Sequence, residues 1–248
     1  MYGRPQPNGG KIPRHAGGFI NALQMTNFAD TVLSLFSSLR IGKALPSGVQ
    51  VLNPYRDPTV MEICQSFYHR FHNDDKKRRI LLGINPGRFG GGVTGISFTD
   101  PVILSEQCGI PNNLGKRTEL SADFIYRVIS AYGGPGKFYE HFYITAVSPL
   151  GFTLNGKNLN YYDIRELQEA ITPFAVKSME RLLKAPVDRS KCYCIGEGQN
   201  FKFLSSLNQQ HHWFEEVIPL AHPRFVMQYR RKQLDDYIDD YLTKLRLP

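Results

Sequence analysis

A glycine-rich segment is the first feature of the sequence that suggests chemistry. Residues 83–98 read GINPGRFGGGVTGISF and contain six glycines. So many residues without a side chain suit a loop whose backbone approaches a ligand closely. The segment lacks the Gly-Lys-Ser/Thr ending of a P-loop. We therefore predict a ligand site other than a P-loop here, and the alternative is a merely flexible loop.

Two polar residues are candidates to act on such a ligand. Asn85 lies in the glycine-rich segment, is followed by Pro86, and offers a side-chain carbonyl without adding a charge. Its alternative role is to cap the turn through its side chain. His222 precedes Pro223, and a histidine can exchange a proton near neutral pH. A lone histidine before proline is more often structural, so the residue types alone leave its role open.

Four short apolar runs are the predicted strands that position these residues. They cover residues 79–84, 142–147, 192–196 and 216–220. Runs of this kind, followed by loops, are typical of buried parallel strands. Ligands of open parallel sheets bind beyond the carboxyl ends of the strands. The loops of interest therefore begin at Asn85, Ser148, Gly196 and Ala221.

Helical patterns separate the predicted strands. They cover residues 19–40, 58–71, 122–132, 164–183 with a kink at Pro173, 199–207 and 225–245. Strands that alternate with helices indicate a three-layer α/β/α sandwich with a central, mostly parallel four-stranded sheet. We expect a flexible leader over residues 1–18 and one domain over residues 19–248.

Composition limits the classes of binding partner and the kind of protein that the sequence can encode. The formal net charge of +8 favours a polyanion. No run of about 18 apolar residues is present and the amino terminus is rich in glycine and proline, which predicts an intracellular protein without a membrane span. The four cysteines are too unevenly spaced for a disulfide scaffold or a paired zinc site, so we expect buried thiols and no metal.

Two motifs in the sequence resemble those of a known family. The glycine-rich segment is similar to the first motif of the single-strand-selective monofunctional (SMUG) branch of the uracil-DNA glycosylase superfamily, roughly GMNPGPFGMAQTGVPFG. The second motif of that branch begins His-Pro after the last strand, where this chain has Ala221-His222-Pro223-Arg224. Weaker matches are Ile195-Gly196-Glu197-Gly198 and Gly156-Lys157-Asn158-Leu159. The resemblance covers about residues 80–241 and implies a DNA N-glycosylase that needs no cofactor.

The resemblance also assigns roles to the motif residues. It implies that Asn85 orients the attacking water and that His222 donates a hydrogen bond to the base O2 as negative charge develops there. It implies that the Phe98 ring stacks on a base flipped out of the DNA, whereas a place in the core is the ordinary alternative for Phe98 and Phe89. The residues expected to bind the base are Ile84, Gly87, Phe89, Phe98 and Ser148.

One departure from the branch concerns recognition of the base. The branch reads uracil with an Asn in a His-Asn-x-Cys-Pro-Leu segment, and the matching residues 145–150 read TAVSPL, so Ala146 replaces that Asn. Loss of a bidentate base contact typically removes ~1–3 kcal/mol of discrimination. Backbone groups or Ser148 are candidates to replace the lost contact, or the preferred base differs.

A second departure follows His222. Residues 224–232 read RFVMQYRRK in place of the longer Pro/Asn-rich wedge of the branch. Basic residues mixed with apolar and aromatic ones can enter a base stack and grip the flanking phosphates. The alternative is the start of a helix with a solvated basic face. The expected DNA contacts are Arg224 and Phe225 as wedge residues, with Arg230, Arg231 and Lys232.

Three hypotheses about function follow. The first is a monomeric glycosylase that flips uracil, or 5-hydroxymethyluracil, out of single- or double-stranded DNA and leaves an abasic site. The second is a glycosylase for another deaminated base, such as xanthine or hypoxanthine, and is motivated by Ala146. The third is a catalytically silent binder of single-stranded DNA on the same fold. A mere binder needs neither Asn85 nor His222, so their presence together argues against the third hypothesis.

Overall fold

A four-stranded sheet forms the centre of the computed structural model, which describes residues 27–247. Neighbouring strands all pair in parallel, in the order β3-β2-β6-β7. The strands are β2 (Arg78–Gly83), β3 (Phe142–Ala146), β6 (Val187–Ile195) and β7 (Glu216–Leu220). Each predicted apolar run is therefore a strand. Strand β2, which lies between β3 and β6, is buried along its whole length.

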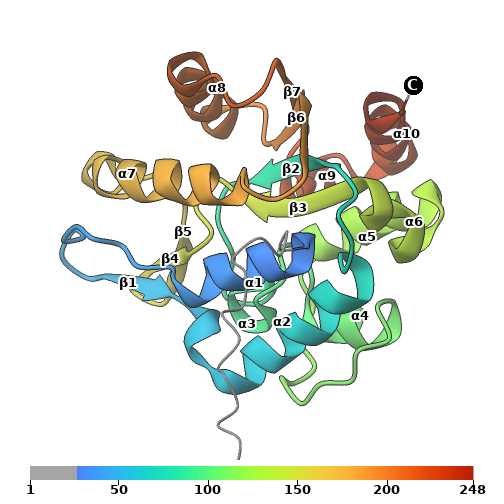
Figure 1. Cartoon of the computed structure of the whole chain (residues 1–248), viewed down its shortest axis with the longest axis horizontal. Coiled ribbons are helices and arrows are strands. Elements are labelled where there is room, and N and C mark those ends of the chain that lie inside the picture. The colour runs from blue at the N-terminus through green and yellow to red at the C-terminus, as the bar shows by residue number, and fades with distance from the viewer. Residues whose placement is uncertain (1–26, 248) are drawn as a thin grey trace, which may run out of the picture.

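Helices cover both faces of this sheet, which confirms the predicted α/β/α fold class. In Figure 1, α7 (Arg165–Leu182) and α8 (Gln199–His211) lie on one side, whereas α5 (Leu120–Tyr132), α9 (Pro223–Tyr229) and α10 (Leu234–Leu245) lie on the other. The remaining helices are α1 (Phe28–Ser37), α2 (Pro58–Phe71), α3 (Gly91–Thr94), α4 (Pro101–Glu106) and α6 (Gly134–His141). Helix α7 is continuous and contains Pro173.

Two predicted helices differ most from the structure. The predicted helix over residues 225–245 is two helices, because the backbone leaves helical geometry at Arg230 (φ −130°, ψ 23°) and again at Gln233 (φ −110°, ψ 22°). The predicted helix over residues 19–40 is observed from Phe28, where the Asn27 side chain accepts the Asp30 N–H at 2.8 Å and caps the first turn. Residues 19–26 and the predicted leader over residues 1–18 lie outside the described part of the chain.

A second, antiparallel sheet is absent from the sequence-based prediction. Its strands, in the order β1-β4-β5, are β1 (Val49–Leu52), β4 (Gly151–Leu154) and β5 (Lys157–Leu159). Asn155 and Gly156 join β4 to β5 with positive φ angles of 50° and 71°, as a tight two-residue hairpin requires. Gly151 allows close contact with the glycine-rich loop, because a Cβ atom there would lie 2.2 Å from the Pro86 carbonyl oxygen. This sheet therefore supports the loop that carries Asn85.

The described residues give no sign of a membrane span or a metal centre. Over residues 27–247, no helix is both long and apolar enough to cross a membrane. The same residues contain no cluster of three or more His, Cys, Asp or Glu side chains that could hold a metal ion. All four cysteines are buried and free, as expected of thiols that only fill the core.

Candidate active site

A cavity of about 510 Å³ lies at the carboxyl edge of the parallel sheet. Asn85 follows β2 and His222 follows β7, and because the strands are parallel both residues reach this edge. Gly196 follows the intervening strand β6 and adopts a φ of +118°, so no side chain from the end of β6 fills the space between them. The cavity brings together seven of the predicted site residues, namely Ile84, Asn85, Gly87, Phe98, His222, Arg224 and Phe225.

The Asn85 side chain is held in a single orientation. Its Nδ2 donates to the Leu159 carbonyl at 3.2 Å, and its Oδ1 accepts the Tyr161 N–H at 3.0 Å. Tyr161 is itself fixed, because its hydroxyl donates to Asn200 Oδ1 at 2.8 Å. The buried Asn200 in turn donates to the Ile195 carbonyl at 3.1 Å. Asn85 Oδ1 keeps a second lone pair, so the network presents an oriented acceptor to the cavity.

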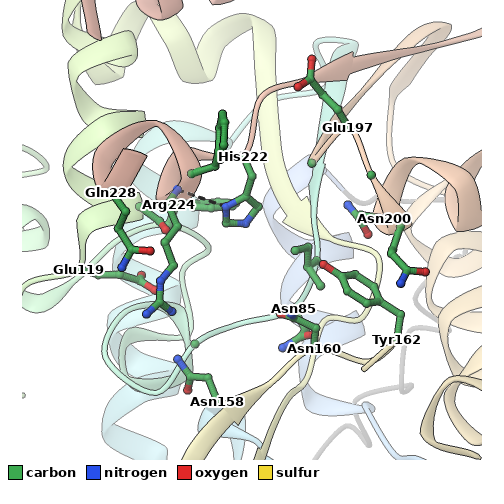
Figure 2. Close-up of a pocket in the computed structure, with 18 of the residues that line it drawn as sticks. Asn85, Glu119, Asn158, Asn160, Tyr162, Glu197, Asn200, His222, Arg224 and Gln228 are labelled. Atoms are coloured by element: carbon green, nitrogen blue, oxygen red, sulfur yellow. Dashed lines mark hydrogen bonds between the residues drawn. The ribbon is translucent and has the colours of Figure 1, made fainter. Parts of the chain in front are cut away.

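His222 presents a hydrogen-bond donor to the same cavity. Its Nδ1 accepts the Arg224 N–H at 3.2 Å and so caps the first turn of α9. Burial, reinforced by the positive charge of Arg224, lowers the pKa of His222 to about 4. The ring is therefore neutral at physiological pH, and because Nδ1 is an acceptor the proton must lie on Nε2. Figure 2 shows the ring projecting into the space between α9 and Asn85.

Phe98 forms an aromatic wall and has an unusual backbone. Its φ is +52°, a left-handed conformation that costs energy in a residue with a Cβ atom. The turn before it is fixed by Thr94, whose hydroxyl donates to the Thr99 carbonyl at 2.7 Å and accepts the Ile96 N–H at 3.1 Å. The Phe98 ring lies directly over Gly83, where a Cβ atom would come within 2.7 Å of the ring. Glycine at the end of β2 therefore makes room for the ring.

Several polar lining residues are missing from the sequence-based prediction. They are Glu119, Ser121, Asn158, Asn160, Tyr162, Glu197, Gln199, Asn200, Gln228 and Tyr229. Figure 2 shows Glu119 on the side of Arg224 and Gln228, facing Asn85 and Tyr162 across the cavity. Asn158 and Glu197 lie in the two segments that weakly resemble the SMUG branch, so the sequence could have identified them. Glu119 comes from the loop before α5, outside any motif, and only the fold brings it to the site.

Comparison with known proteins agrees with this geometry. The family model of the uracil DNA glycosylase superfamily matches residues 69–246. The chain belongs to this superfamily. The crystal structure of wild-type Pedobacter heparinus SMUG2 has a TM-score of 0.85 and 41% sequence identity, over 88% of this chain and 96% of that one. A search of curated proteins gave no match.

Membership in the superfamily, together with the similarity to SMUG2, supports a DNA glycosylase, that is, a hydrolase whose substrate is DNA. It also confirms the resemblance drawn from the two motifs. The order of the motifs, one after β2 and one after β7, places them on either side of one cavity.

A second cavity of about 400 Å³ adjoins the main one in this glycosylase and contains Phe89. Phe89 is 38% exposed and does not line the main cavity. The Arg88 guanidinium lies 4.5 Å from its ring centroid, and the Arg117 guanidinium lies 5.7 Å from it. Arg224 lines both cavities, and Lys157 lines the second. The aromatic ring therefore lies in a basic surface beside the site and not in the core.

The other four predicted residues of the glycosylase do not line the main cavity. Ser148 does not line the cavity, because its side chain is fully buried and its hydroxyl donates to the Leu150 carbonyl at 2.8 Å. Arg230 lies at the mouth, where its guanidinium is 5.3 Å from the ring centroid of Phe225. Arg231 and Lys232 are exposed in a short 3-10 helix before α10 and do not line the cavity.

Proposed function

We propose that this glycosylase hydrolyses the N-glycosidic bond of uracil in DNA and leaves an abasic site. The observation that carries the proposal is an oriented acceptor, Asn85 Oδ1, and a neutral donor, His222 Nε2–H, that line one cavity. Loss of a base from its sugar creates positive charge on the sugar and negative charge on the departing base. An acceptor that holds water and a donor that faces the base are the two groups that this reaction requires.

The reaction in this site follows from the two groups. Water bound to Asn85 Oδ1 places its oxygen toward the sugar C1′, and that oxygen bonds to C1′ as the C1′–N1 bond breaks. The bonding electron pair leaves on the base, where His222 Nε2–H donates to O2 as the negative charge develops. The proton released by the water ends on the base or in solvent. Asn85 and His222 both remain uncharged throughout.

The mouth of the cavity has the character of a DNA-binding surface. Phe225 and Tyr229 are exposed at 40% and 68%, and their ring centroids lie 6.0 Å apart on α9. Arg224 and Arg230 flank this aromatic pair. Exposed aromatic rings between cations suit the bases and phosphates of a distorted strand. A base must leave its stack to enter the cavity beyond, where the Phe98 ring is placed to stack on it.

Base release from oligonucleotides that contain one uracil tests the proposal. We expect the wild-type protein to release uracil and Asn85→Ala to lose about 10²-fold or more of the single-turnover rate, since the water loses its oriented acceptor. Asn113→Ala, at an exposed asparagine outside the cavity, is the matched control. An Asn85→Ala protein as active as the wild type would remove Asn85 from the mechanism.

The choice of base is tested by a substrate panel. Ala146 stands where an amide is expected, so the panel includes 5-hydroxymethyluracil, xanthine and hypoxanthine beside uracil. Faster release of one of these would assign the site to that base. Salt-dependent binding of single-stranded DNA with no release of any base would instead support a silent binder.

A further inference from the structure

A narrow recess extends the main cavity toward the end of β3. The residues that line it are Gly83, Ile84, Asn85, Pro86, Gly87, Gly91, Ser97, Phe98, Glu119 and Ala146. Ile84, Asn85, Gly87, Phe98 and Glu119 line both the recess and the main cavity, so the two spaces adjoin. If Asn85 and His222 act on the glycosidic bond, the edge of the base remote from the sugar faces this recess.

The recess contains few side chains that can recognise a base edge. Ala146 contributes only a methyl group, and the Asn85 amide is bonded to backbone at both ends, with the remaining Oδ1 lone pair assigned to the water. The Ser148 hydroxyl is committed to the Leu150 carbonyl. Ser97 contributes a small side chain. Among the described residues that line the recess, Glu119 is the ionisable one, so it is the strongest candidate to read a base edge.

The backbone near Glu119 is shaped around its carboxyl group. The Glu119 N–H donates to Asp100 Oδ2 at 3.0 Å, which fixes the start of α5. A Cβ atom at Gly90 would lie 1.9 Å from Glu119 Oε2, and one at Gly87 would lie 2.9 Å from Oε1. The carboxyl group thus lies against the loop that carries Asn85, in space that exists because two loop residues are glycine.

The surroundings of Glu119 favour its uncharged form. Burial first, and the Asp100 carboxylate second, raise the pKa of Glu119 to about 7, against the opposing charge of Arg224. His222, across the same cavity, is neutral in this range. Both the acid and the carboxylate of Glu119 are therefore populated near neutral pH. An amide in this place would not titrate.

We propose that Glu119, as a carboxylic acid, hydrogen-bonds the N3–H and O4 edge of uracil and replaces the amide that Ala146 lacks. A carboxylic acid has one O–H donor beside one carbonyl acceptor, the same pair that an amide offers. Its O–H donates to O4 and its carbonyl oxygen accepts N3–H. The ionised carboxylate has only acceptors and repels O4, so it binds this edge poorly. The inference rests on the proposed function and names the residue that reads the base.

The kcat/KM for uracil release, measured from pH 5.5 to 9, tests the inference. In the wild type we expect a plateau at low pH and a decline above about pH 7, because the carboxyl group loses its proton. Glu119→Gln keeps a donor beside an acceptor and should retain activity without this decline. Glu119→Ala should lose roughly 10- to 100-fold, the usual value of a bidentate base contact. Glu180→Gln on the exposed face of α7 is the matched control and should follow the wild type.

The outcomes separate this inference from the proposed function. No uracil release by the wild type would overturn the proposed function. Release by the wild type with the same decline in Glu119→Gln, or with full activity in Glu119→Ala, would overturn only the role of Glu119. Circular dichroism and thermal melting of each variant show whether it is folded, and Glu119→Gln, which keeps the shape of the side chain, tests the role even if Glu119→Ala does not fold.

Discussion

The two sides of the cavity hold their functional side chains in different ways. On the side of Asn85, the amide is bonded at both ends and the Tyr161 and Asn200 side chains fix the backbone that holds it. On the opposite side, residues 27–247 show no hydrogen bond to the Glu119 carboxyl oxygens, which lie against Gly87 and Gly90 and feel the charge of Arg224. A bond-breaking group must be placed to within a fraction of an ångström. A group that recognises a base must present the right hydrogen-bond donors and acceptors, and the protonation of a carboxyl group changes these with pH.

His222→Leu should have the largest effect, because it removes the donor that faces the departing base. Loss of one donor to a developing anion costs about 10²- to 10³-fold in rate, measured as single-turnover release of uracil.

The low pKa of His222, about 4 against an ordinary 6.5, keeps the ring neutral down to about pH 5. In the Glu119→Gln background, the rate should therefore show no inflection between pH 5 and 7. An inflection near pH 6.5 that His222→Leu abolishes would contradict a neutral histidine.

Gly151→Ala should have the next largest effect, and Gly90→Ala serves as its counterpart on the other side. The new methyl group at 151 would meet the Pro86 carbonyl, a backbone atom, at 2.2 Å and displace the residue next to Asn85. A displacement of this kind costs about 10²-fold in kcat.

At residue 90 the methyl group would meet the mobile end of Glu119, which can swing away. We expect a loss of about tenfold, mainly in KM, near the lower value of a base contact. Equal losses of kcat in Gly151→Ala and Gly90→Ala would show that the two sides of the cavity are equally rigid, against the difference described above.

Tyr161→Phe should have the smallest effect on the reaction and a clear one on stability. It leaves Asn200 Oδ1 buried without its donor, a loss of roughly 1–3 kcal/mol in the free energy of unfolding. Urea denaturation measures this loss, and release of uracil should slow only a few-fold, because the Tyr161 N–H still binds Asn85. An unchanged midpoint of denaturation would mean that the Asn200 network does not support this side.

The sequence predicts the central sheet and the Asn85 and His222 ends of the site well. Buried parallel strands are continuous apolar runs, so each appears in the sequence without knowledge of its neighbours. Asn85 and His222 follow such strands directly, and their meeting at one edge is a consequence of parallel pairing.

The residues that the prediction missed depend on packing between distant segments. Glu119 reaches the site only because the loop before α5 packs against Gly87 and Gly90, which no local pattern encodes. The division between α9 and α10 is also hidden, since residues 225–245 keep a helical apolar spacing through the break. The β4–β5 hairpin differs from both, because Asn155-Gly156 is a strong local signal for a two-residue turn and was available in the sequence.

The left-handed backbone of Phe98 sets a limit on how stable this protein can become. A non-glycine residue in that conformation costs about 1 kcal/mol or more, and glycine would relieve the cost but remove the ring from the wall of the cavity. Selection for a more stable fold therefore favours glycine at residue 98, whereas selection for base binding favours phenylalanine. Attempts to raise the melting temperature of this protein should leave residue 98 unchanged and seek their gain in the helices far from the carboxyl edge of the sheet.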